Sequence, residues 1–97
     1  YDAAYARFEV EYEYNGDEEA WISGFVYNDR YKVSRAYKPA IIHSGKNVAE
    51  VKIIVSFKED DPDTKESNEI VFKMYNSSGG RSISRRFDYD KVWSKNP

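Results

Sequence analysis

Residues 8–14 read Phe8-Glu9-Val10-Glu11-Tyr12-Glu13-Tyr14, a strict alternation of apolar or aromatic side chains with glutamates. Successive side chains of a β-strand point to opposite faces, so the alternation places all the apolar side chains on one face and the three glutamates on the other. The stretch therefore predicts a half-buried β-strand whose apolar face covers a core.

Similar patterns recur along the 97-residue chain. Residues 49–58 alternate with Ala49, Val51, Ile53, Val55 and Phe57 on one face, and residues 70–75 and 83–89 alternate more briefly. Residues 20–27 are apolar on both faces, which is typical of a central strand. The polar and basic segment 31–37 predicts one or two edge strands, because Pro39 ends it and cannot donate to a central ladder. No strand order is predicted between residues 28 and 43.

Turn residues separate these segments, as in Asn15-Gly16-Asp17, and the acidic stretch 59–69 predicts an exposed loop. No window shows a capped apolar stripe of helical period, and leucine, the usual filler of helix interfaces, is absent from the chain. The sequence thus predicts an all-β fold, a two-layer antiparallel β-sandwich of about seven strands, as a single domain over residues 1–97.

Three stretches set the spacing of strands and turns: residues 8–12 as a first strand, residues 44–47 leading into 51–55, and residues 70–75 joined through Gly79-Gly80 to the last strand. This spacing resembles that of the immunoglobulin-like and fibronectin-III-like domains of bacterial surface and secreted proteins. The resemblance implies an immunoglobulin-like sandwich. A secreted or cell-surface location is expected, with a cytoplasmic one as the alternative, since a chain without cysteine fits both.

Composition excludes several function classes. A net charge of −2 gives no field for nucleic acid or an anionic membrane, and no apolar run reaches the length of a membrane-spanning helix. His43 is the only histidine, no catalytic or nucleotide-binding motif occurs, and the carboxylates lie in open loops or on solvated faces. We therefore expect no enzyme and no required cofactor. Basic residues are expected to pair across strands with Glu9, Glu11, Glu13 and Glu50; the alternative is a patch for an anionic polymer or an acidic partner. They are Arg30, Lys32, Arg35, Lys38, Lys46, Arg81, Arg85 and Arg86.

Two sets of residues are candidate sites. Exposed aromatic rings can stack on sugars, although a small sandwich also needs large side chains to fill its core. The candidate ligand-binding rings are Trp21, Tyr27, Tyr31, Tyr37, Tyr75 and Trp93. Clustered carboxylates can hold calcium, and a solvated loop is the alternative for the same composition. The candidate calcium ligands are Asp60, Asp61 and Asp63, and an immunoglobulin-like order would bring their loop to the same end as Asp17, Glu18 and Glu19.

The expected function is a non-catalytic accessory or adhesion-type module of a larger extracytoplasmic protein. It would act as a spacer, or contact another protein or the rest of its parent chain through loops or a strand edge. Two alternatives stand beside it: a carbohydrate-binding module that uses exposed Trp and Tyr for a polysaccharide, and an intracellular scaffold or trafficking domain.

Overall fold

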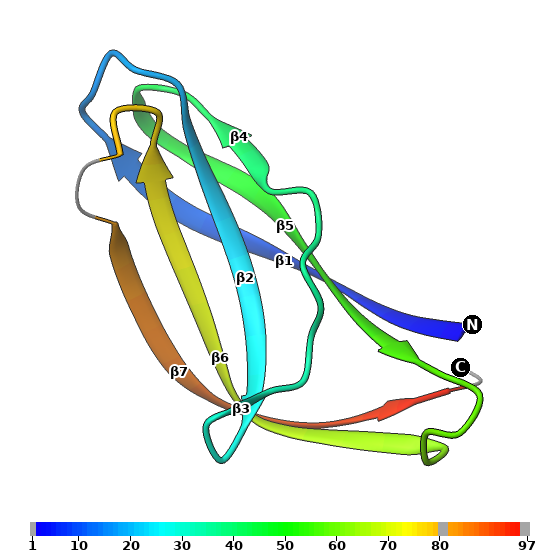
Figure 1. Cartoon of the computed structure of the whole chain (residues 1–97). Helices are drawn as coiled ribbons and strands as arrows, with labels where there is room; N and C mark the ends of the chain where they lie inside the picture. Colours follow the sequence, from blue (N-terminus) through cyan, green and yellow to red (C-terminus); the bar gives the residue numbers. More distant parts are fainter. Residues whose placement is uncertain (1, 80–81, 96–97) are drawn as a thin grey trace.

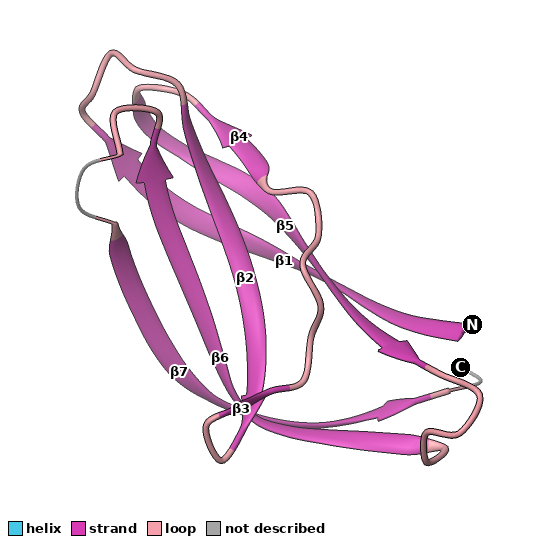
Figure 2. Ribbon diagram, in the orientation of Figure 1, coloured by secondary structure: helices cyan, strands magenta, loops and turns pink. Residues whose placement is uncertain are grey.

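The computed structural model describes residues 2–79 and 82–95, and every regular element in these ranges is a β-strand (Figures 1 and 2). The strands are β1 (Asp2–Tyr14), β2 (Ala20–Asn28), β3 (Tyr31–Lys32), β4 (Ala40–Ile42), β5 (Gly45–Phe57), β6 (Thr64–Asn76) and β7 (Ile83–Ser94). The predicted all-β class and the count of about seven strands are confirmed. The described ranges contain no helix that is long and apolar enough to cross a membrane.

The strands form two antiparallel sheets. β1 pairs with β5 over its whole length, from Asp2 opposite Phe57 to Tyr14 opposite Gly45, and makes a two-stranded ribbon. The second, large sheet has the order β3-β2-β6-β7, and β4 joins it by pairing with β2. As the double-sided apolar pattern predicts, β2 lies in the interior of this sheet.

The chain between β2 and β5 runs the length of the molecule only once. β3 pairs with the C-terminal end of β2, and β4 pairs with its N-terminal end. Between β3 and β4, Arg35 forms a single β-bridge to Ile54 of the ribbon. The edge strand predicted in residues 31–37 is thus only the two residues of β3, because the rest of the segment crosses between the sheets. An immunoglobulin-like order needs two passages here. The single passage sets the direction of β5 and leaves the ribbon two strands wide.

The hairpin of β6 and β7 is longer than the sequence predicts. Residues 64–69 belong to β6, whereas their polar composition predicts a loop; they pair with the end of β7 up to Ser94. Between the pairs Ser67/Lys91 and Glu69/Asp88, two residues of β7 stand opposite one residue of β6, which is a β-bulge. A bulge bends the strands and increases their twist. Figure 1 shows β6 and β7 bending together near β3, so the end of the hairpin turns under the ribbon.

The core lies between the ribbon and the large sheet. β5 packs on β2 so closely that a Cβ atom placed on Gly24 would lie 3.0 Å from Cγ1 of Val51. β1 packs over β6 and β7, where the ring of Phe8 meets the rings of Phe72 and Tyr89 at centroid distances of 5.8 and 5.4 Å. The face of β1 that bears Phe8, Val10, Tyr12 and Tyr14 is the inner one, as the opening alternation predicts.

Candidate functional site

One inward-facing part of the large sheet is left uncovered. Ile83 and Phe87 of β7 stand opposite Met74 and Ile70 of β6, whose side chains face the ribbon. Ile83 is nevertheless 48% exposed and Phe87 53% exposed. The ribbon ends at β1 and does not reach over this part of β7. Inner-face residues of a sandwich are normally buried between the layers, so the exposure of Ile83 and Phe87 shows that this part of the sheet is open to solvent.

The uncovered region forms a groove with a volume of about 290 Å³, which we call the β1–β7 groove. Its lining is mainly apolar, with charged side chains at its mouth. The lining residues are Val10, Glu11, Tyr12 and Glu13 of β1, Ile22 of β2, Phe72 and Met74 of β6, and Ile83, Arg85 and Phe87 of β7. Phe72 and Phe87 meet edge to face on its floor, with centroids 6.3 Å apart.

The backbone of β1 has a free edge beside this groove. The N–H of Arg35 donates to the carbonyl of Ile54 over 3.0 Å, so the backbone groups of Ile54 point away from β1. In an antiparallel pair the residue directly opposite then also points its backbone groups outward, and that residue is Tyr5. The register is unbroken up to Tyr14, so Arg7, Glu9, Glu11 and Glu13 also turn their N–H and C=O groups to the free edge. No other strand of the described chain pairs with this edge.

The outer face of β1 is acidic next to this edge. Glu9 stands directly opposite Glu50 on β5, a like-charge pair that is unfavourable at cross-strand distance. Within the described residues, the only ion pair on this face joins Lys46 Nζ to Glu13 Oε2 over 3.7 Å. Of the four glutamates expected to pair with basic residues, only Glu13 does so in the described chain; Arg86 pairs instead with Glu69, and Arg81 lies outside the described residues. Glu9 and Glu11 form no hydrogen bond or ion pair with the described chain.

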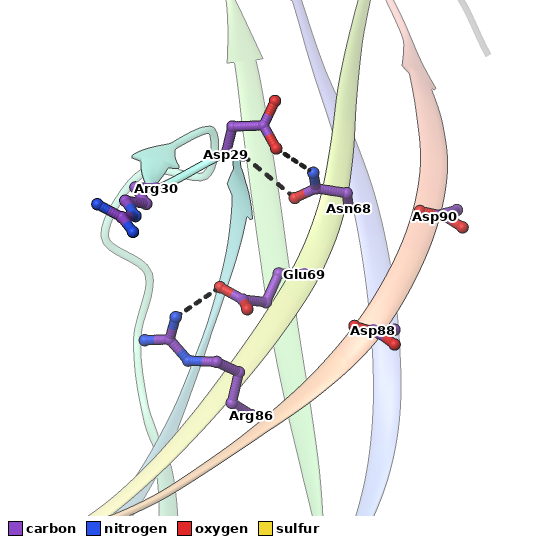
Figure 3. A pocket seen from close by; sticks show the side chains of 7 residues that line it. All are labelled: Asp29, Arg30, Asn68, Glu69, Arg86, Asp88 and Asp90. Carbon is purple, nitrogen blue, oxygen red and sulfur yellow. Dashed lines mark hydrogen bonds and ion pairs between the residues drawn. The ribbon is translucent and has the colours of Figure 1, made fainter.

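A second, polar depression lies at the turn between β2 and β3 (Figure 3). Asp29 and Arg30 both have positive φ, as a two-residue hairpin turn requires. Asn68 of β6 holds the turn: its side-chain amide donates to the Asp29 carboxylate over 2.7 Å and accepts from the Asp29 N–H over 3.2 Å. Arg86 donates to Glu69 over 2.8 Å. All of these contacts join side chains of the protein to one another. The depression therefore has a structural role, which is to hold the β2–β3 turn against the β-bulge of the β6–β7 hairpin.

The six candidate aromatic residues do not form one face. Trp93 is 1% exposed, and its indole N–H donates to the hydroxyl of Ser67 over 3.0 Å, so it is a core residue that a sugar cannot reach. Tyr31 and Tyr37 are exposed on the connection that follows β2. Trp21 and Tyr75 stand opposite each other on the outer face of the large sheet, with ring centroids 5.6 Å apart and planes at 32°, and Tyr27 lies on the same strand and face as Trp21.

The predicted meeting of the two acidic loops is wrong. Residues 15–19 follow Tyr14, while the loop with Asp60, Asp61 and Asp63 follows Phe57, at opposite ends of a 13-residue ribbon about 40 Å long. The single passage between β2 and β5 is the cause, because it reverses the direction of β5. Among the described residues, no three His, Cys, Asp or Glu side chains gather closely enough to hold a metal ion.

Asp61 itself has a local role. Its carboxylate accepts from the N–H of Lys58 over 2.7 Å and pairs with Lys65 Nζ over 3.1 Å. These two hydrogen bonds lower the pKa of the Asp61 carboxyl below its ordinary value of 3.8. In the core, burial of Tyr89 raises the pKa of its phenol above 10.0. Neither group contacts the β1–β7 groove.

The sequence pattern places Ile83 and Phe87 on the same face of the last strand, which is correct. It missed the groove because alternation does not indicate whether a second layer is wide enough to cover that face. A usable signal was the composition of segment 31–42, which is too polar and too irregular to supply two full strands.

Comparison of this chain with family models, with curated proteins and with solved structures finds no match, so its two-sheet architecture and its β1–β7 groove carry the functional argument alone.

Proposed function

We propose that this chain is a non-catalytic protein-interaction module of a larger protein, and that the β1–β7 groove is its contact surface. The observation that carries the proposal is the half exposure of Ile83 and Phe87 on the inner face of the sheet, beside an unpaired strand edge. Contiguous apolar surface with a polar rim is typical of sites that bind another chain. A free strand edge is the other common element of peptide recognition.

Two further features support this function. Phe72 and Phe87 form a fixed aromatic floor, and large aromatic side chains in a concave surface are the usual anchors of protein interfaces. The flanking regions are held rigidly, since β1 pairs with β5 along its whole length and β7 pairs with β6. A groove with rigid walls loses little conformational entropy on binding. The resemblance to immunoglobulin-like accessory domains enters this proposal only through the two-sheet architecture.

The test is a selection from a displayed library of random peptides, with the Phe87→Asp variant as counter-selection. We expect enrichment of peptides that bind the wild-type chain and lose at least tenfold in affinity for the variant. Val92→Asp is the matched control, because Val92 is similarly exposed, at 55%, on the opposite face of β7. Failure to enrich any peptide, or enriched peptides that bind Phe87→Asp as well as wild type, would exclude the groove as the contact surface.

A carbohydrate-binding function is the second candidate, and the pair Trp21 and Tyr75 favours it. Their rings lie side by side on the outer face of the large sheet, and Ile41, the neighbour of Trp21 on β4, is 57% exposed. Adjacent rings can stack on the C–H faces of a sugar. Titration with soluble polysaccharides should quench the fluorescence of Trp21 in the wild type, and the quenching should reach saturation. In Tyr75→Ala the quenching should no longer saturate. An unchanged spectrum with every polysaccharide would reject this candidate.

A further inference from the structure

We propose that the β1–β7 groove accepts one extended segment of a partner protein, in which apolar side chains alternate with basic ones, as a third strand of the ribbon. The inference rests on the proposed interaction function and specifies the conformation and chemistry of the partner. Three features of the groove define that partner: the free backbone edge of β1, the exposed apolar residues of β7, and the row of glutamates on the outer face of β1.

The backbone of the groove favours an extended partner. Arg7, Glu9, Glu11 and Glu13 direct their N–H and C=O groups to the free edge, in the spacing that an added strand satisfies. Strands in a sheet lie about 4.8 Å apart, so a strand paired with β1 would extend the ribbon toward the uncovered part of β7. A helix placed there would satisfy none of these backbone groups.

The apolar half of the partner follows from the inner face. A strand added to β1 turns every second side chain inward, to the same side as Val10 and Tyr12. These side chains would contact Ile83 and Phe87 and remove their exposed surface from water. Burial of apolar surface is the main favourable contribution to such an association.

The basic half of the partner follows from the outer face. The alternate side chains of the added strand would stand beside Glu9, Glu11 and Glu13, of which only Glu13 forms an ion pair, with Lys46, in the described chain; Arg7 and Lys52 precede this row on the same face. Lysine or arginine at these positions would form opposite-charge cross-strand pairs. Arg85 lies on the inner side of the groove, so these basic side chains point away from its guanidinium.

The same glutamates disfavour a second copy of this chain as the occupant. If the free edges of two β1 strands met antiparallel about Glu11, Glu11 would stand opposite its own copy and Glu9 opposite Glu13, and like charges across strands are destabilising. Charged side chains on an edge strand are a common protection against uncontrolled pairing with identical chains. The acidic row thus discriminates between a basic partner strand and self-association.

The test uses two nine-residue synthetic peptides with valine at the same alternate positions and either lysine or glutamate at the others. Isothermal titration should give a dissociation constant about tenfold lower for the lysine peptide, the size expected for two or three cross-strand charge pairs. The Glu11→Lys variant should abolish or reverse this preference. Glu59→Lys, with the same charge change in the exposed loop after β5, should leave it unchanged.

Hydrogen exchange monitored by NMR locates the bound peptide. In the free chain the amides of Glu9 and Glu11 should exchange quickly and that of Val10, paired with β5, slowly; the lysine peptide should protect the two glutamate amides. The peptides could bind in a way that Phe87→Asp abolishes and yet show no preference for lysine over glutamate and no protection of these amides. That result would overturn the strand model and retain the interaction function. Absence of any Phe87-dependent binding in the library selection would exclude the groove as the contact surface, and the strand model with it. Chain dimerisation that Phe87→Asp abolishes would identify a second copy as the occupant and reject the basic partner.

Discussion

The two halves of β7 have the same alternation and the same partner strand, but different surroundings. In the second half, Trp93 is buried with Ala4 and Phe57, because the bulge turns this end of the hairpin under the ribbon. In the first half, Ile83 and Phe87 occupy equivalent inward positions and remain about half exposed. The difference shows that an inward-facing side chain is buried only where the opposite layer extends over it.

The closed half should carry most of the stability. Trp93→Ala should lower the free energy of unfolding by about 3–5 kcal/mol, because it leaves a large cavity and removes the indole N–H that donates to the Ser67 hydroxyl. Phe87→Ala should cost about 1 kcal/mol or less, since its ring is already 53% exposed. Urea denaturation followed by circular dichroism measures both values. Equal losses at the two positions would mean that the groove is closed in solution.

Added volume should distinguish the covered and uncovered sides of the core. Gly24→Val places methyl groups against Val51 and Ile53, which already lie 3.0 and 3.1 Å from a Cβ atom at this position. Overpacking of this kind costs about 1–3 kcal/mol. Ile83→Phe adds more volume at the open groove and should change stability by less than about 0.5 kcal/mol. Thermal melts of both variants check this, and a large loss for Ile83→Phe would contradict an open groove.

The smallest expected effect concerns the loop at the closed end. The pKa of the Asp61 carboxyl is lowered by its hydrogen bonds to Lys58 and Lys65, so its charged form stabilises the fold above pH 3.8 and this contribution is lost as the pH falls through the lowered value. Asp61→Asn should therefore reduce the melting temperature slightly at pH 7, and the difference from wild type should shrink as the pH falls below 3.8. Asp60→Asn is the matched control: the described chain gives the Asp60 side chain no hydrogen bond or ion pair, so this variant should leave the melting temperature at pH 7 unchanged.

Much of the strand framework could be predicted from local pattern. The alternation in residues 8–14 and 49–57 correctly assigns the inner faces of β1 and β5, and the double-sided pattern of residues 20–27 correctly predicts the interior position of β2. Residues 64–69 escaped prediction, because they have no apolar alternation and become a strand only by pairing with the end of β7. Ser67 shows why: it is 4% exposed and serves as the partner of the Trp93 indole, a role that its polarity alone does not indicate.

The site was predictable only in its components. The sequence predicts that Glu9, Glu11 and Glu13 share one face of the first strand, and that Ile83, Phe87 and Tyr89 share one face of the last. It does not indicate that the outer edge of β1 is unpaired, because pairing depends on where the chain between β2 and β5 runs. The immunoglobulin-like order assumed that the chain crosses the molecule twice between β2 and β5. That assumption also led to the wrong prediction that the two acidic loops lie at the same end.

The sequence by itself determined the all-β class, the inner and outer faces of the long strands, and the acidic character of β1, because these depend on neighbouring residues whose side chains alternate at a period of two. Only the tertiary structure decided which strand edges are paired, how wide each sheet is, and therefore which inward-facing residues are covered. Those properties depend on contacts between segments far apart in the chain, such as Arg35 with Ile54 or Ser67 with Trp93. The β1–β7 groove is the clearest result of that difference.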